Sequence, residues 1–327
     1  MARMLEMLDV HEGQRVLEIG TGTGYNAALL AKLVGARGAV TTVDIDKEVA
    51  AMARGGLMAT RSPARVVVGD GRAGVADAAP VDRLIVTAST ETVPRAWFNQ
   101  LIPGGTLVVP LRLSTTLFAV QAVAAFRKVA AGFDSLEVTG GGFMALRGAG
   151  DHRPRAATIV APEATDEHND RSLVELSGPA IAALDSAARQ RLLVTALGFA
   201  RRRRVNLGGV PSWALATYAA LALPQERLVE CGRLAWVACG EHGLGVLDAA
   251  DGSLAFLVGD GHRAHIEAHD GRGAENALLN VVDRWQLAGQ PTVERLTIKV
   301  RYGLERPHAW YSTRRGDQWI AFDWRRT

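Results

Sequence analysis

The sequence is poor in cysteine, with only Cys231 and Cys239 among its 327 residues. Two cysteines cannot build a disulfide framework, and no further cysteine or histidine completes a zinc-ribbon spacing around them. We therefore interpret both as reduced thiols that pack as small apolar side chains, and we expect a cytoplasmic protein.

Long hydrophobic runs, a signal sequence and a strong charge of one sign are also missing. No segment approaches the ~20 consecutive apolar residues that a membrane span needs. The opening residues, MARMLEMLDVHEG, lack the basic and then apolar layout of a secretory signal. A formal net charge of +3 gives no large basic field that would attract nucleic acid. We expect neither a membrane nor a nucleic-acid partner, and the composition indicates no oligomeric state.

What is present is an ordinary globular composition, 48% hydrophobic and 22% charged, in a chain long enough for about two domains. Short apolar runs alternate with helical stretches over residues 15–111. This alternation is typical of parallel βαβ units, with helices on both faces of one sheet. We expect strands at 15–20, 39–45, 64–70, 82–88 and 106–111, helices at 25–35, 47–57 and 94–101, and edge strands at 118–126 and 135–146.

The chain turns polar and loop-like between residues 148 and 171, GAGDHRPRAATIVAPEATDEHNDR. We place a domain boundary there, between an α/β domain at 1–150 and an accessory α+β domain at 151–327. In the second domain we expect helices at 179–204, 211–223 and 275–289, and strands at 233–243, 244–252, 253–261, 294–303 and 308–324.

A glycine loop follows the first expected strand. Gly20, Gly22 and Gly24 form the pattern E-x-G-x-G-x-G, in which Glu18 ends the strand. Glycine lets the backbone turn sharply and lets a ligand approach where a Cβ atom would collide. The helix that follows offers free N–H groups and the positive end of its dipole to such a ligand. A dinucleotide fingerprint would read G-x-G-x-x-G, and no G-K-[ST] follows as in a P-loop. The alternative is a tight strand-to-helix turn without a ligand.

Carboxylates stand at the ends of the next two strands. Asp44 ends the strand in AVTTVDI, where a carboxylate accepts hydrogen bonds from ribose hydroxyls in doubly wound folds. The alternative role is a helix N-cap, for which Asp46 is better placed. Asp70 and Gly71 end the third strand as GDG, where a carboxylate can receive an adenine amino group. Consecutive strand ends are where such sheets bind ligands.

In order and spacing, VLEIGTGTGYNAALLA, VTTVDI, VVVGDG and DRLIVTASTETVPRAWFNQLIPGGTLVVPL resemble the protein-L-isoaspartate O-methyltransferases over about residues 3–147. GGFMALRG at 141–148 is similar to the closing strand of that family. The resemblance implies a Rossmann-like sheet that binds S-adenosyl-L-methionine, and it implies that Thr87, Ala88 and Ser89 line the face where cofactor and substrate meet. Carried across position by position, the implied cofactor contacts are Glu18, Gly20, Thr21, Gly22, Thr23, Gly24, Asp44, Ile45, Asp70 and Gly71.

The implied reaction is esterification of an aspartyl or isoaspartyl carboxyl group in a peptide or protein. A peptide carboxylate is ionised at neutral pH and attacks a sulfonium methyl group without first losing a proton. Alignment and desolvation then supply most of the rate gain, so we assign no catalytic acid, base or metal. Once esterified, the carboxyl group can be attacked by the next backbone nitrogen, which expels methanol and closes a succinimide.

Two departures from the family pattern bear on the substrate. Family members carry some tens of residues before the first strand, including a Ser-Gln-Pro-like stretch that grips the substrate carboxylate, where this sequence has MARMLEMLDVHEG. The combination of this methyltransferase type, the GFMALRG closing motif and an appended domain is similar to enzymes that tailor ribosomally made peptides. Such an enzyme needs a dedicated docking surface, which an extra domain can supply. We favour tailoring of a chosen aspartate. The alternatives are general isoaspartate repair, an impaired cofactor- or peptide-binding module, and methylation of a small molecule.

Three conspicuous features of the second half of the chain each allow two interpretations. The arginines at 201–204 could bind an acidic peptide or nucleic acid, and we favour a basic helix C-terminus. His262, His265 and His269 suggest a metal, but no cysteine or acidic ligand joins them at a usual spacing. We interpret the tryptophans of the last hairpin as core or sheet-face aromatics rather than a peptide-gripping shelf; they are Trp310, Trp319 and Trp324.

Overall fold

A computed structural model of the chain describes residues 1–117, 120–148, 158–160, 174–233 and 242–325. The chain divides into two compact units. The first comprises Met1–Arg112, Gln121–Asp151 and Glu294–Arg326, and the second comprises mainly Leu113–Val120 and His152–Val293.

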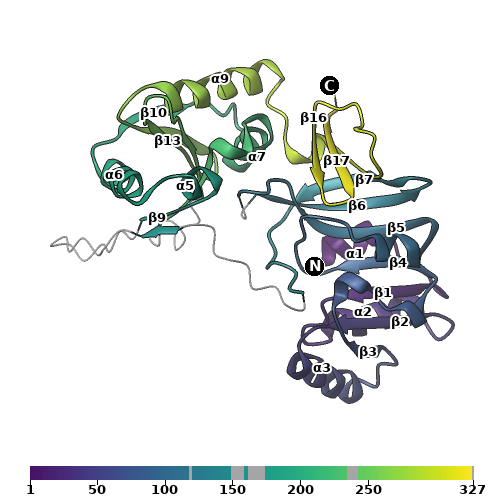
Figure 1. The fold of residues 1–327 in the computed structure, drawn as a ribbon. Coiled ribbons are helices and arrows are strands. Elements are labelled where there is room, and N and C mark those ends of the chain that lie inside the picture. Colours follow the sequence, from purple (N-terminus) through teal and green to yellow (C-terminus); the bar gives the residue numbers. More distant parts are fainter. Residues whose placement is uncertain (118–119, 149–157, 161–173, 234–241, 326–327) are drawn as a thin grey trace. The chain divides into compact units, whose positions relative to one another are not determined.

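The first unit is built on a ten-stranded sheet with the order β16-β17-β15-β7-β6-β5-β4-β1-β2-β3 (Figure 1). Its strands are β1 (Arg15–Ile19), β2 (Ala39–Asp44), β3 (Arg65–Val68), β4 (Val81–Val86), β5 (Leu101–Arg112), β6 (Gln121–Val129), β7 (Gly132–Gly140), β15 (Leu296–Tyr302), β16 (Tyr311–Arg315) and β17 (Gln318–Trp324). Its α-helices are α1 (Ala2–Leu8), α2 (Tyr25–Val34), α3 (Lys47–Ala59) and α4 (Arg95–Gln100).

The predicted Rossmann-like α/β sheet is confirmed. Strands β1 to β5 pair in parallel, and β6 and β7 continue the sheet in antiparallel pairing. Buried side chains of α1, α2 and the sheet form one hydrophobic core, which includes Leu8, Leu30 and Ile85. On β1 the burial is almost continuous, as expected for a strand covered on both faces. Residues 142–146, expected as part of an edge strand, form only an isolated bridge between Ala145 and Ser89.

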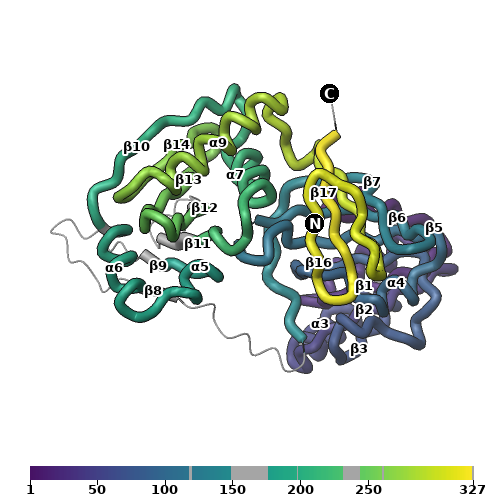
Figure 2. Tube along the Cα trace, turned by 45° about the horizontal axis from the view of Figure 1, so that its top comes forward, coloured from purple at the N-terminus to yellow at the C-terminus, as the bar shows by residue number. Residues whose placement is uncertain are grey.

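The end of the chain joins the first sheet, which corrects the predicted division at residue 150. Strand β15 pairs antiparallel with β7, for example Val300 with Phe133, and β17 and β16 continue outward from β15. Figures 1 and 2 both show these yellow strands beside β7. The predicted hairpin at 308–324 is confirmed, with its turn between Arg315 and Gln318. Local patterns indicated these strands correctly but carried no signal for their distant partner.

The second unit contains a seven-stranded antiparallel sheet with the order β10-β14-β13-β12-β11-β9-β8. Its strands are β8 (Thr158–Val160), β9 (Val174–Ser177), β10 (Arg201–Val205), β11 (Leu228–Arg233), β12 (His242–Leu247), β13 (Leu254–Asp260) and β14 (Arg263–His269). Its α-helices are α5 (Pro179–Ala182), α6 (Ser186–Leu197), α7 (Ser212–Ala222) and α9 (Gly273–Leu287). The expected α+β character of this part of the chain is thus present.

The single helix expected at 179–204 is wrong. Helix α6 ends at Leu197, Gly198 follows in an extended conformation, and the four arginines form β10 instead of a helix C-terminus. Most of the strand expected at 233–243, together with Cys239, lies outside the described residues. Across the ranges described, no helix is both long and apolar enough to cross a membrane, and no group of three or more His, Cys, Asp or Glu is placed to hold a metal ion.

Candidate functional site

The predicted site residues gather at the carboxyl ends of four neighbouring strands. In the order β5-β4-β1-β2-β3 the direction of the chain path reverses between β1 and β4. Open α/β sheets bind ligands at such a point, outside the carboxyl ends of the strands. Glu18 and Asp44 lie within the last two positions of β1 and β2, and the other predicted site residues lie in the segments that follow β1, β2, β3 and β4.

The glycine loop after β1 needs its glycines. Gly20, Gly22 and Gly24 have φ angles of 94°, 52° and 80°, a region that residues with a Cβ atom rarely enter. At Gly20 an added Cβ atom would also lie 2.4 Å from Oγ1 of Thr87, at the end of β4. The Thr87 hydroxyl donates to the carbonyl oxygen of Gly20 at 2.7 Å, so the ends of β1 and β4 are joined here. Thr23 is exposed at the loop tip.

Asp44 ties the loop after β1 to the loop after β2. Its Oδ2 accepts from the backbone N–H of Thr21 at 3.0 Å and of Gly22 at 3.3 Å, and its Oδ1 accepts from the N–H of Asp46. Asp44 and the following Ile45 remain partly exposed. Asp46 is the N-cap of α3, accepting from the N–H groups of residues 48 and 49, which confirms the role predicted for it.

Glu18 differs from the other carboxylates because its side chain is fully buried. Its Oε1 accepts from Nδ2 of Asn26 in α2 at 2.7 Å. Burial raises the pKa of Glu18 to about 7, although hydrogen bonds from Thr42 and Asn26 pull it downward; the charge of Asp44 adds a smaller upward effect. Glu18 therefore carries a proton for part of the time at neutral pH.

Asp70 and Gly71 are held from two sides. Asp70 forms an ion pair with Arg72 at 2.7 Å. The indole Nε1 of Trp97, buried in α4, donates to the carbonyl oxygen of Gly71 at 2.7 Å. A Cβ atom at Gly71 would lie 2.4 Å from Cγ2 of Ile19, so this turn packs directly against the end of β1. No local pattern indicates that a tryptophan 26 residues away holds this turn.

Ser89 lies at the expected place but is buried, with 1% of its surface exposed. Its hydroxyl donates to the carbonyl oxygens of Phe143 and Met144, and its N–H donates to the carbonyl oxygen of Met144 at 2.8 Å. Its side chain thus holds the segment 143–146 against the end of β4. Ala88, next to it, remains partly exposed.

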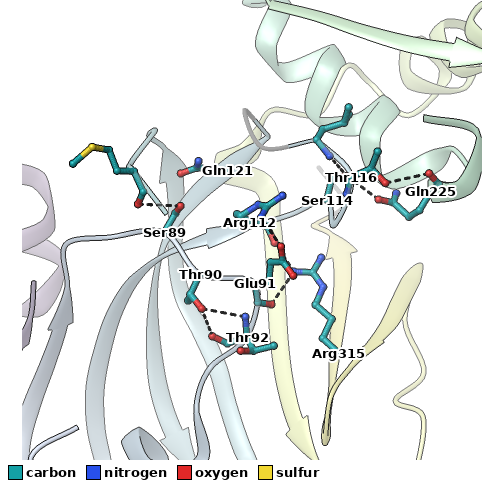
Figure 3. A network of polar contacts seen from close by, with 12 residues as sticks. Ser89, Thr90, Glu91, Thr92, Arg112, Ser114, Thr116, Gln121, Gln225 and Arg315 are labelled. Atoms are coloured by element: carbon teal, nitrogen blue, oxygen red, sulfur yellow. Dashed lines mark hydrogen bonds and ion pairs between the residues drawn. The ribbon is translucent and has the colours of Figure 1, made fainter. Parts of the chain in front are cut away.

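A charged cluster beyond β4, not predicted from the sequence, is formed by the partly exposed Glu91 and the buried Arg112 and Arg315 (Figure 3). The Arg112 guanidinium forms an ion pair with the Glu91 carboxylate. Arg315, from the C-terminal hairpin, donates to the carbonyl oxygens of Arg112 at 2.6 Å and Glu91 at 2.9 Å. Burial lowers the pKa of Arg315 to about 10, which still leaves it charged at neutral pH. Glu91 and Arg112 are 21 positions apart in the sequence, and Arg112 and Arg315 are 203 positions apart, so no local motif indicates the cluster.

The C-terminal strands also hold Val93, which lies farther along the loop after β4. Gln318 accepts from the N–H of Val93 at 3.0 Å and donates to its carbonyl oxygen at 3.1 Å. The Tyr302 hydroxyl donates to the same carbonyl oxygen at 2.8 Å. The loop that continues from Thr87 to Ser89 is therefore fixed by strands from the far end of the chain.

Comparison with known proteins identifies the first part of the chain. Residues 1–140 match the family model described as protein-L-isoaspartate(D-aspartate) O-methyltransferase. The chain is 44% identical over 120 residues to protein-L-isoaspartate O-methyltransferase 1 of Archaeoglobus fulgidus, covering 36% of this chain and 56% of that protein. It is 39% identical over 120 residues to the Thermotoga maritima protein-L-isoaspartate O-methyltransferase, covering 35% of this chain and 36% of that protein.

The chain spans only about half the length, or less, of these curated relatives. A solved structure titled protein-L-isoaspartate O-methyltransferase aligns over 92% of this chain and 77% of its own, with 22% identity and a TM-score of 0.45. The fold assignment therefore rests on the strand order of the sheet and not on this similarity. By the family match and the relatives, residues 1–140 of this chain are similar to the protein-L-isoaspartate(D-aspartate) O-methyltransferase family.

Proposed function

We propose that the chain is an S-adenosyl-L-methionine-dependent carboxyl O-methyltransferase that esterifies an isoaspartyl or aspartyl side chain of a peptide or protein. The observation that carries this proposal is the joined arrangement at the switch point of the sheet. A positive-φ glycine loop, the Asp44 bridge and the Asp70–Gly71 turn lie at three adjacent strand ends. They do so within residues 1–140, which match the family whose name states this reaction.

The residues present fit the cofactor. At Gly22 no atom lies within 4 Å of the position a Cβ would take, so the loop leaves open space beside bare backbone. Asp44 is partly exposed and has lone pairs left for ribose hydroxyls. Oε2 of Glu18 is buried without a hydrogen bond of normal geometry from the described residues, which suits a neighbouring cationic amino group.

In this proposal Glu18, the glycine loop and Asp44 hold the amino-acid and ribose parts of the cofactor, and Asp70 with Gly71 holds the adenine. When bound, S-adenosyl-L-methionine supplies a methyl group on a sulfonium, which an ionised carboxylate accepts without giving up a proton. The protein's own part is positioning. Thr87 joins the two central strand ends, and Ser89 with the C-terminal hairpin fixes the loop on which the acceptor would lie.

The names of the relatives favour an isoaspartyl acceptor, as in repair. The finer hypothesis is tailoring of a chosen aspartate in a precursor peptide, with succinimide or isoaspartate as the product. The second unit supports it, because the described residues of this unit form a separate seven-stranded sheet, and none of the predicted cofactor-binding residues belongs to it. An impaired module that binds cofactor or peptide without turnover is the remaining alternative.

The proposal is tested by incubating the full chain with methyl-labelled S-adenosyl-L-methionine and an isoaspartyl peptide. A carboxyl methyl ester releases its label as methanol under mild alkali, whereas a methylated nitrogen keeps it. Alkali-labile label on the peptide is the expected result. Alkali-stable label would refute carboxyl transfer, and cofactor binding measured by calorimetry without any label would favour the impaired module.

A further inference from the structure

Strand β10 at the edge of the second unit's sheet presents a row of arginines. Among the described strands it pairs only with β14, so its other side is an open sheet edge. Arg201, Arg202, Arg203 and Arg204 are all exposed. Because side chains alternate along a strand, the second and fourth arginines share one face and the first and third share the other.

The two faces of β10 differ in what surrounds them. Arg201 is held by the chain around α9, where it donates to the carbonyl oxygens of Asp270 at 2.9 Å and Gly271 at 2.7 Å. On the opposite face Arg202 pairs with the buried Glu267 at 2.8 Å. Arg204 lies opposite His265 in the register, and no carboxylate of the described residues forms an ion pair with it.

A cavity of about 730 Å³ lies along this second face. Arginine and histidine side chains from β10 and from the β13–β14 turn line it, together with the loop at 205–209, and none of its lining residues is Asp or Glu. The cationic or titratable lining residues are Arg202, Arg204, His262, Arg263 and His265. Glu267 orients two of them, because its carboxylate contacts both Arg202 and His265.

Charged residues on an edge strand also prevent edge-to-edge aggregation. That role needs no cavity lined by basic side chains, so it does not account for this face. An open strand edge beside a basic cavity offers two kinds of contact to one ligand. Backbone N–H and C=O groups pair with an extended polypeptide, and arginines form charge-assisted hydrogen bonds with its carboxylates.

We propose that the β10 edge is a docking site for an acidic peptide segment, which adds to the sheet as a further strand. Its acidic side chains, at alternate positions, face Arg202, Arg204 and Arg263. Nucleic acid supplies negative charge but no strand to pair with the edge, so the observations favour a peptide. This docking does not depend on methyl transfer and is measured separately from it.

The test uses the full chain and a short fluorescent peptide of alternating glutamate and threonine, with binding followed by fluorescence anisotropy. Arg204→Glu is compared with Arg203→Glu, a matched control that makes the same change in charge one residue away on the opposite face. We expect Arg204→Glu to weaken binding by ~10-fold or more and Arg203→Glu by less than ~3-fold. Circular dichroism checks that both variants are folded, and Arg204→Gln, which introduces no new charge, should also weaken binding.

A twin peptide, N-methylated at every second residue, separates strand addition from charge attraction alone. It keeps every carboxylate and loses backbone donors, so its binding should fall below that of the parent peptide. The proposal is overturned if the parent peptide does not bind, if both arginine variants lose binding equally, or if N-methylation has no effect. It is equally overturned if an oligothymidylate binds more tightly than the peptide and shows the same Arg204 dependence.

Discussion

Replacing Glu18 by glutamine should change how the stability of the first unit depends on pH. The Glu18 carboxyl is fully buried, and burial raises its pKa from the ordinary 4.5 to about 7. In the unfolded chain the same group titrates near its ordinary value. Between these two values the folded protein therefore holds a proton that the unfolded chain has lost.

The sign of the effect follows from this difference in bound protons. A pKa that is raised in the folded state stabilises that state fully below the unfolded value, and the contribution is lost as the pH rises through the folded value. One pH unit is worth ~1.4 kcal/mol, so the span from 4.5 to about 7 corresponds to ~3 kcal/mol. Glutamine does not titrate and keeps the acceptor for Asn26. The free energy of unfolding of Glu18→Gln, relative to the parent, should rise by ~3 kcal/mol from about pH 4 to about pH 8.

Urea unfolding of both proteins at a series of pH values measures this difference. Hydrogen exchange of the β1 amides identifies which transition belongs to the first unit. Glu305→Gln, at an exposed position in the same unit, is the matched control and should leave the pH dependence unchanged. If the difference in free energy of unfolding between Glu18→Gln and the parent stays constant to within ~1 kcal/mol over this pH range, then the pKa of the buried carboxyl is not raised.

Four further substitutions test the site and its support. Gly20→Ala meets both a positive φ and a hydroxyl 2.4 Å away, so calorimetry should show cofactor affinity falling by ~10-fold or more. Asp44→Ala should weaken cofactor binding to a similar degree. Asp46→Ala removes the N-cap of α3 and should mainly lower the free energy of unfolding, by ~1 kcal/mol. Gln318→Leu leaves the buried N–H of Val93 without its acceptor, so the free energy of unfolding measured in urea should fall by ~1–3 kcal/mol. The KM for the peptide should change more than the affinity for the cofactor. Unchanged values would contradict the supporting role of Gln318.

The parallel sheet and the cofactor loop were predictable because their signals are local. Four of the five residues of β1 are buried, and Gly20, Gly22 and Gly24 stand where the backbone takes positive φ angles. The N-cap role of Asp46 was equally local, since it depends on N–H groups two and three residues ahead. Features that depend on residues close together in the sequence were therefore predicted correctly.

The failures are at non-local contacts. Nothing near Val300 indicates that its strand pairs with Phe133, so the C-terminal strands were assigned to the wrong domain. The Arg112–Glu91 pair, with Arg315 beside it, likewise depends on distant chain segments. The helix predicted at 179–204 failed for another reason: Gly198 gives a stop signal, but the alanine- and arginine-rich composition on either side has high helix propensity.

The most direct measurement of the central claim is mass spectrometry of twin peptides, one isoaspartyl and one aspartyl, after incubation of the full chain with S-adenosyl-L-methionine. The account predicts that at least one twin gains the mass of one methylene group, or loses water as a succinimide. Gain on the isoaspartyl twin alone would assign repair, and gain on an aspartyl twin alone would assign tailoring. No change in either peptide, with cofactor demonstrably bound, would contradict the proposed methyltransferase activity.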